Sequence, residues 1–400
     1  GAAETGAEPE QEERTEDGAE PGATVIMPAQ EGEKKQVVPP PVLGSARLTM
    51  WLLMILPWFA CHAVRKGLPI LIEFICRDLG YNDAQKGQLL GSFFPGYVLA
   101  QIPSGVAAKV WGGKAVNTAL FYGQGVVVAL MPLLAGGGRR GLLGLCGCMS
   151  VIGVLQAPLV PGLGPMERAW MPPGPERALS LRIPHLGIRF SFLSALSIPL
   201  LATRFGWRVV PYVLSAGSIL LGVVWQLWAA ETPAEWRKTP AMSVAERELF
   251  GLDPNPAAPV PKKKRAAGLS LATYFVKVPQ AWLPVLGHTT GVAIDYALMQ
   301  WSPTRYLEEL GCSPAQMGVH VAIPSAVDIF AQFVTSAIEG AINKAGVPQV
   351  KIHKLNALVG SISQAFMLLI FGMTRTPWIA TTAVCFISPC QPLTAAVLTL

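Results

Sequence analysis

Long apolar runs, separated by short polar loops, limit this chain to the folds that a lipid bilayer permits. Only 14% of its 400 residues are charged, against about 25% in ordinary soluble domains. Most of the runs are long enough for a helix that crosses the roughly 30 Å hydrocarbon core. Because only helices and closed barrels satisfy all their backbone hydrogen bonds in lipid, we expect an all-α membrane protein. We place about ten spans, at 49–75, 86–108, 115–135, 141–161, 179–202, 208–230, 279–301, 314–338, 355–373 and 377–400.

Composition divides the chain into four parts. Residues 1–46 are rich in Glu, Ala, Gly and Pro and are typical of a disordered acidic tail. Residues 47–230 hold six spans, 231–278 form a long basic loop, and 279–400 hold about four further spans. Within the loop, the stretch SVAERELF predicts a short helix with Ser243 as its N-cap.

The distribution of Lys and Arg predicts the orientation. The tail, the long loop and the other loops on the same side of the membrane hold most of the 31 basic residues. Loops rich in Lys and Arg stay in the cytoplasm, so we expect a cytoplasmic N-terminus. The formal net charge of +6 does not indicate nucleic acid, because the basic residues lie in loops between apolar runs. Membrane lipids are the expected surroundings, and the plastid envelope, a vesicle and the plasma membrane all stay open.

Sequence motifs do not indicate an enzyme. The chain contains no G-x-S-x-G elbow, Walker loop or H-E-x-x-H pair. Its seven cysteines lack the spacing of a disulfide framework or a zinc site. We therefore expect no enzymatic activity, no metal and no cofactor. Without a nucleotide motif, an ion gradient is the expected source of energy for any transport.

Six spans, a basic loop and a second set of spans are similar to the layout of the major facilitator superfamily. The stretch GQLLGSFFPGYVLAQIPSGVAAKVWGGKAV at 87–116 resembles the signature region of that superfamily's anion:cation symporter family. This family includes sodium/phosphate cotransporters, sialin, vesicular glutamate transporters and plant plastid anion transporters. Further similar stretches are FGWRVVPYV at 205–213, WSPTRYLEELG at 301–311 and VKIHKLNALVGSI at 350–362.

The resemblance implies two six-helix halves, with the second half incomplete in this sequence, and a secondary active transporter. The implied substrate is inorganic phosphate or a small organic anion, driven by a Na⁺ or H⁺ gradient through alternating access. A second reading is a non-transporting, truncated or sensor-like membrane protein of the same family. It depends on the two final spans that are not seen and on Lys109, which stands where the family's loop motif normally has an acid.

Arg65 is the predicted substrate contact. It lies about 5 Å past the middle of the first span at 1.5 Å per residue, and the family's cavity-lining arginine aligns with it. His62 lies three residues earlier, on the same helix face, and is the second predicted substrate contact. Lys66 points about 100° away from Arg65 around the helix. We therefore interpret Lys66 as a structural or snorkelling charge.

The seventh span carries the predicted coupling residues. His288, Gly291 and Asp295 share one helix face, and an intramembrane His and Asp suit a proton-coupled step. The alternative is a structural role, with His288 hydrogen-bonded and Asp295 paired to a neighbouring helix. The vesicular glutamate branch has an arginine where Gly291 stands, which argues against glutamate as the substrate. By resemblance, Glu176 and Arg177 after the fourth span are further gating candidates.

Two intramembrane charges match no family motif. These are Arg189 in the fifth span and Asp328 in the eighth. A carboxylate facing lipid would be costly, so we expect Asp328 to face the interior of the helix bundle.

Overall fold

The computed structural model describes residue 1 and residues 41–171, 177–252, 282–344 and 349–395. Side chains within these ranges are described except at 177–179, 283–284, 288, 332–333, 335–344, 349–357 and 388–395. The predicted acidic tail, except residue 1 and the few residues at its end, and much of the predicted basic loop lie outside the described residues. The described chain is helical throughout its regular elements, as predicted for an all-α membrane protein.

Six predicted spans of the first half correspond to nine helices, because three spans are each built from two helices that follow one another. We call this group of helices the first half. It comprises α1 (Ala46–Leu79), α2 (Asp83–Gly91), α3 (Phe93–Trp111), α4 (Gly113–Leu134), α5 (Gly138–Gln156), α6 (Leu159–Trp170), α7 (Arg177–Phe190), α8 (Phe192–Phe205) and α9 (Val209–Trp228).

The described part of the second half has four long helices and one π-helical turn. Two short elements precede it in the long loop, η1 (Pro233–Glu235) and α10 (Val244–Leu249). The second half itself comprises α12 (Trp282–Thr304), the π-helical turn η3 (Arg305–Glu309), α13 (Pro314–Lys344), α14 (Gln349–Met373) and α15 (Pro377–Ala395).

Proline explains why the second span consists of two helices. Pro95 has no backbone N–H to donate to the carbonyl of Gly91, so a continuous helix would lose that hydrogen bond. The chain instead ends α2 at Gly91 and starts α3 at Phe93. Pro95 then lies in the first turn of α3, where the backbone N–H groups have no partner within the helix.

Both ends of α1 are capped by specific residues. The Ser45 side chain accepts a hydrogen bond from the backbone N–H of Leu48, and Gly80 ends the helix in the left-handed region at φ 68°. Buried Glu246 of α10 accepts hydrogen bonds from the backbone N–H groups of Ala46 (3.4 Å) and Arg47 (3.0 Å). Ser243 caps α10 in a capping box, which confirms the prediction for SVAERELF. The long loop is thereby joined to the start of the first span.

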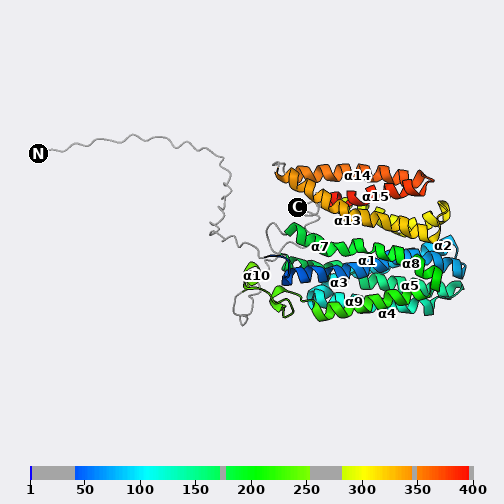
Figure 1. Ribbon diagram of the computed structural model, residues 1–400, viewed down its shortest axis with the longest axis horizontal. Helices are drawn as coiled ribbons and strands as arrows, with labels where there is room; N and C mark the ends of the chain where they lie inside the picture. Colours follow the sequence, from blue (N-terminus) through cyan, green and yellow to red (C-terminus); the bar gives the residue numbers. More distant parts are fainter. Residues whose placement is uncertain (2–40, 172–176, 253–281, 345–348, 396–400) are drawn as a thin grey trace. The chain divides into compact units, whose positions relative to one another are not determined.

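Helices pack side by side within each half, and in the first half the packed partners are not consecutive in sequence (Figure 1). In the first half, α1 packs on α7, α3 on α5, and α4 on α9; in the second half, α14 packs on α15. The halves meet mainly through α8 against α13 and α1 against α12. One cluster of buried apolar side chains contains residues of both halves, including Leu68, Ile198 and Met317. The two halves therefore share a core.

Five helical segments of the described residues are long and apolar enough to cross a membrane. They are Ala46–Leu79, Gly113–Leu134, Gly138–Trp170, Ser180–Phe205 and Val209–Trp228. Large apolar side chains are exposed on many helices, for example Val98, Leu99 and Ile102 on α3. Exposed apolar faces of this extent suit lipid rather than water. The chain is an integral membrane protein.

Glycines allow α3 and α5 to approach each other closely. A Cβ atom placed at Gly96 would overlap the backbone carbonyl of Ser150, and one placed at Gly153 would overlap that of Phe93. Small residues at such crossings let membrane helices pack backbone against backbone.

We expect Gly96→Ala to lower the free energy of unfolding by about 1–3 kcal/mol, since the added methyl group forces the two backbones apart. Gly147→Ala on α5 is the matched control, because a Cβ there meets no described atom within 4 Å. Thermal unfolding of both variants in detergent tests this. Equal melting temperatures would contradict the close crossing.

Candidate functional site

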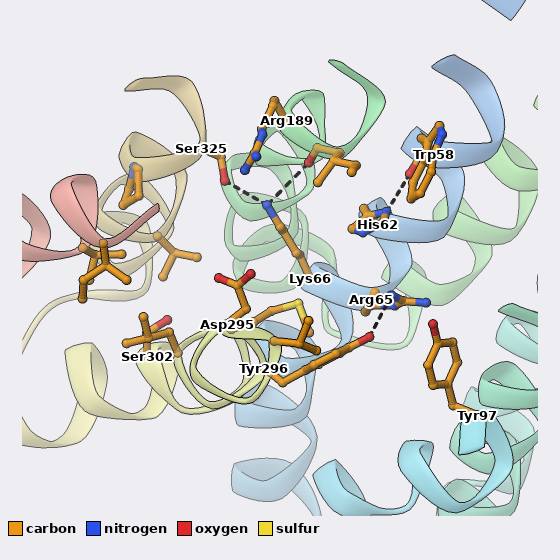
Figure 2. A pocket seen from close by; sticks show the side chains of 18 of the residues that line it. Trp58, His62, Arg65, Lys66, Tyr97, Arg189, Asp295, Tyr296, Ser302 and Ser325 are labelled. Carbon is orange, nitrogen blue, oxygen red and sulfur yellow. Dashed lines mark hydrogen bonds between the residues drawn. The ribbon is translucent and has the colours of Figure 1, made fainter. Parts of the chain in front are cut away.

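A cavity of about 1030 Å³ lies between the two halves. Side chains from α1, α3 and α7 of the first half line it, together with side chains from α12, η3, α13 and α15 of the second half (Figure 2). Its wall combines aromatic and aliphatic groups with a small set of charged ones. The charged or titratable side chains that line it are His62, Arg65, Lys66, Arg189, Asp295, Tyr97, Tyr296, Tyr306 and His320.

Arg65 is held in the cavity wall by neutral partners. Its Nε donates to Gln156 Oε1 at 2.9 Å, and its Nη1 donates to the Tyr296 hydroxyl at 2.9 Å. The guanidinium carbon lies 5.1 Å from the ring centre of Tyr97, 5.3 Å from that of Phe93 and 5.8 Å from that of Tyr296. Cation–π contacts of this kind stabilise the charge without neutralising it. Two nitrogens of the guanidinium are thus fixed, and its plane is set.

The third nitrogen of Arg65 is unsatisfied. Nη2 is buried and makes no hydrogen bond to a described residue. The Tyr97 hydroxyl points towards the guanidinium (Figure 2). Within the part of the chain that the structure describes, Arg65 forms no ion pair with a carboxylate. A buried charged donor without a partner costs at least about 1–3 kcal/mol, and an anion beside Nη2 would remove that cost.

His62 and Lys66 line the same cavity as Arg65. The interpretation of Lys66 as a structural or snorkelling charge stays a prediction, although its side chain lines the cavity. Residues 100° apart on a helix can both line a cavity of this width, since it extends around more than one face of α1. Lys66 Nζ donates to Ser325 Oγ at 2.9 Å and to the carbonyl of Ile188 at 3.5 Å, and the Asp295 carboxylate points towards it (Figure 2).

The two charges without a family match pair with each other across the halves. Arg189 on α7 forms an ion pair with Asp328 on α13. Asp328 is fully buried, which confirms the prediction that it faces the bundle interior. At this level of the cavity the first half supplies two cations, Lys66 and Arg189. The second half supplies two carboxylates, Asp295 and Asp328. The sequence could not show this pairing, because the residues are 139 positions apart by their numbers and belong to different halves.

A second charged cluster joins the halves near the turns at 80–82 and 310–313. Lys86 on α2 donates to Glu73 on α1 at 3.1 Å and to Glu308 on η3 at 2.6 Å. Thr304 at the end of α12 donates to Glu73. The Lys86 and Glu73 side chains are 4% and 2% exposed, whereas that of Glu308 is 43% exposed. The halves are therefore in contact at this end of the bundle.

Several residues in the cavity wall or in contact with it were not predicted from the sequence. Gln156 and Tyr296 orient Arg65, and Tyr306, His320 and Thr381 form a hydrogen-bonded group in the second half. His320 Nδ1 and the Tyr306 hydroxyl both lie 2.8 Å from Thr381 Oγ1. An amide within an apolar run, as at Gln156, is the one signal that could have pointed to a functional position.

Three of the predicted site residues line the cavity, and the side chains of the other three lie outside the described residues. It brings His62, Arg65 and Asp295 together around one cavity. Arg177 begins α7, but its side chain lies outside the described residues, as does the whole of Glu176. His288 belongs to α12, and its side chain is also outside what is described.

Two contacting groups of membrane-crossing helices with a charged cavity between them form an arrangement that is typical of membrane transporters. The family model of the Major Facilitator Superfamily matches residues 51–399. The chain belongs to this superfamily, as the sequence motifs predicted.

Similar proteins of known name are anion transporters. The chain is 26% identical over 84% of its length to "Probable anion transporter 4, chloroplastic" of Oryza sativa subsp. japonica, and spans 54% of that protein. It is 27% identical over 80% of its length to "Sodium-dependent phosphate transport protein 1, chloroplastic" of Arabidopsis thaliana, and spans 60% of that protein. The chain therefore covers little more than half the length of these relatives.

A solved structure shows the same fold. It is the crystal structure of a bacterial homologue of the human lysosomal transporter Spinster, in an inward-facing, unoccupied conformation. The TM-score is 0.63 at 16% sequence identity, and the match covers 88% of this chain and 74% of that one.

Proposed function

We propose that this chain is the binding core of a secondary active transporter for inorganic phosphate or a small organic anion. Arg65 is the anion contact, and its unsatisfied Nη2 is the observation that carries the proposal. An arginine edge suits carboxylate and phosphate oxygens, and the Tyr97 hydroxyl is placed to donate to the same anion. The names of the two relatives, an anion transporter and a phosphate transport protein, support the class of substrate.

The driving force in this proposal is a Na⁺ or H⁺ gradient, coupled by rocking of the two halves around the cavity. Arg65, Lys66 and Arg189 of the first half face Asp295 and Asp328 of the second, so movement of the halves changes the field around the anion. With the N-terminus in the cytoplasm, the contact between Lys86 and Glu308 lies at the non-cytoplasmic end of the bundle and closes the cavity there. Relatives named as chloroplastic favour a plastid membrane.

Anion binding by the purified full chain in detergent tests the proposal. Trp58 lines the cavity, so its fluorescence is expected to change when inorganic phosphate, sulfate, ascorbate or gluconate binds. If none of the four binds, the anion assignment is wrong. Uptake into liposomes, with the Na⁺ and H⁺ gradients collapsed in turn, then identifies the coupling ion. Binding without uptake under either gradient would favour the non-transporting reading.

A further inference from the structure

His62 has a fixed tautomer that prevents it from binding an anion in its neutral form. Its Nδ1 lies 3.0 Å from the backbone carbonyl oxygen of Trp58, one helical turn earlier. A carbonyl oxygen only accepts, so Nδ1 carries the hydrogen. The other nitrogen, Nε2, is then an acceptor with a lone pair. It makes no hydrogen bond to a described residue. Nε2 becomes a donor only when it takes up a proton.

The charges closest to His62 are positive. Arg65 and Lys66 follow it on α1 and line the same cavity. Arg65 forms no ion pair with a described carboxylate, whereas the Asp295 carboxylate points towards Lys66 (Figure 2). Arg189 of α7 lines the same cavity and forms an ion pair with Asp328 on α13.

The remaining elements around α1 bring two carboxylates near this part of the helix, Asp295 and Glu167. Asp295 of α12 lies in the cavity wall on the Lys66 side, and α3 contributes the Tyr97 hydroxyl (Figure 2). Glu167 of α6 accepts a hydrogen bond from Trp58 Nε1 at 3.3 Å, and His185 of α7 packs on the same indole. The charges of α4 and α8 are Lys114 and Arg204, near helix ends, and α9 has none. Like charges oppose protonation of an imidazole, and an anion bound to Arg65 would reduce that opposition.

We propose that His62 is the proton acceptor that couples anion binding to proton binding, in an inference that rests on the proposed function. An anion on Arg65 cancels one of the two nearby positive charges and adds an acceptor beside Nε2. A proton from solvent then forms the Nε2–H bond, and the imidazolium donates to the anion. Release of the anion reverses the step and returns the proton to solvent. Because binding linkage is reciprocal, proton binding also tightens anion binding.

The pH dependence of anion affinity tests this inference. The probes are sulfate and ascorbate, whose charge does not change between pH 6 and 8, together with inorganic phosphate corrected for its own titration. For the wild-type chain we expect the Kd to increase as the pH rises, by up to tenfold per pH unit. Binding in unbuffered solution with a pH indicator should show uptake of close to one proton per anion.

His62→Gln should still bind the anion, more weakly and with an affinity that does not change with pH. His62→Asn is the second variant, should the first fail to fold. His185→Gln is the matched control. His185 also directs Nδ1 to a carbonyl four residues earlier (Leu181, 2.8 Å) and also packs on Trp58, but it does not line the cavity. This control should keep the wild-type pH dependence.

The outcomes separate this inference from the proposed function. If His62→Gln keeps the pH dependence while Asp295→Asn or His320→Gln loses it, another group takes the proton and the inference is overturned, although the anion site stands. A wild-type affinity that is independent of pH overturns it as well. If no probe binds to the wild-type chain, or if Arg65→Gln binds as well as wild type, the proposed anion site itself fails.

Discussion

Arg65→Gln is expected to weaken anion binding by roughly 30- to 5000-fold, since removing the charged partner of a buried anion costs about 2–5 kcal/mol. Arg65 is the one cation at this site with a buried nitrogen that makes no hydrogen bond to a described residue. Glutamine can reproduce neither the charge nor the planar fork. Arg65→Lys keeps the charge but loses the geometry that contacts Gln156, Tyr296 and the anion together. We therefore expect an intermediate affinity for it.

Arg65→Gln should not lower the stability of the fold. Because Arg65 pairs with no described carboxylate, its removal leaves no buried negative charge behind, and the unfolding temperature of Arg65→Gln in detergent should equal or exceed that of wild type. Arg208→Gln is the matched control. Arg208 also contacts an aromatic ring (Trp207, 4.6 Å) and a hydrogen-bond acceptor (Asp78, 3.0 Å), but its side chain is 54% exposed and it does not line the cavity. Wild-type binding by Arg65→Gln would show that the anion site lies elsewhere.

Lys86→Met is expected to lower the free energy of unfolding by about 3–5 kcal/mol, because it leaves a buried carboxylate without its cation. Glu73 is 2% exposed and has Lys86 as its charged partner. The Thr304 hydroxyl that also donates to Glu73 cannot balance its charge. Unfolding of the variant in detergent, followed by tryptophan fluorescence, measures the loss.

Two further variants separate the buried pair from the contact between halves. Glu308→Gln should cost at most about 1 kcal/mol, since the Glu308 side chain is 43% exposed and its carboxylate is already hydrated. Glu73→Gln combined with Lys86→Met should recover much of the stability, because the uncompensated charge is gone. If Glu308→Gln and Lys86→Met destabilise the chain equally, the burial of the Lys86–Glu73 pair does not explain the effect.

This difference in burial also bears on how the halves could separate. The pair within the first half, Lys86 with Glu73, is buried, and the charged partner from the second half, Glu308, is partly hydrated. Breaking the contact with Glu308 exposes no new buried charge. The expected small effect of Glu308→Gln therefore also measures how little this contact opposes opening of the bundle at that end.

The helical membrane fold was predictable from the sequence, because lipid leaves so few choices. The hydropathy of the runs and the signature stretch at 87–116 led to the all-α superfamily fold, which the structure and the family comparison confirm. Capping residues are local signals, so the short helix that begins after Ser243 was predictable too. Helix breaks such as the one before Pro95 were not predicted, although their cause is also local.

The sequence by itself determined that Arg65 and His62 share one face of a membrane helix, since helical spacing alone fixes the angle between them. Only the tertiary structure decided which charges meet. Lys66 lines the cavity, Arg189 pairs with Asp328, and Lys86 joins Glu73 to Glu308. Each of these depends on how helices from distant parts of the chain pack. The period of a helix orders the residues along one element, and only packing places two elements against each other.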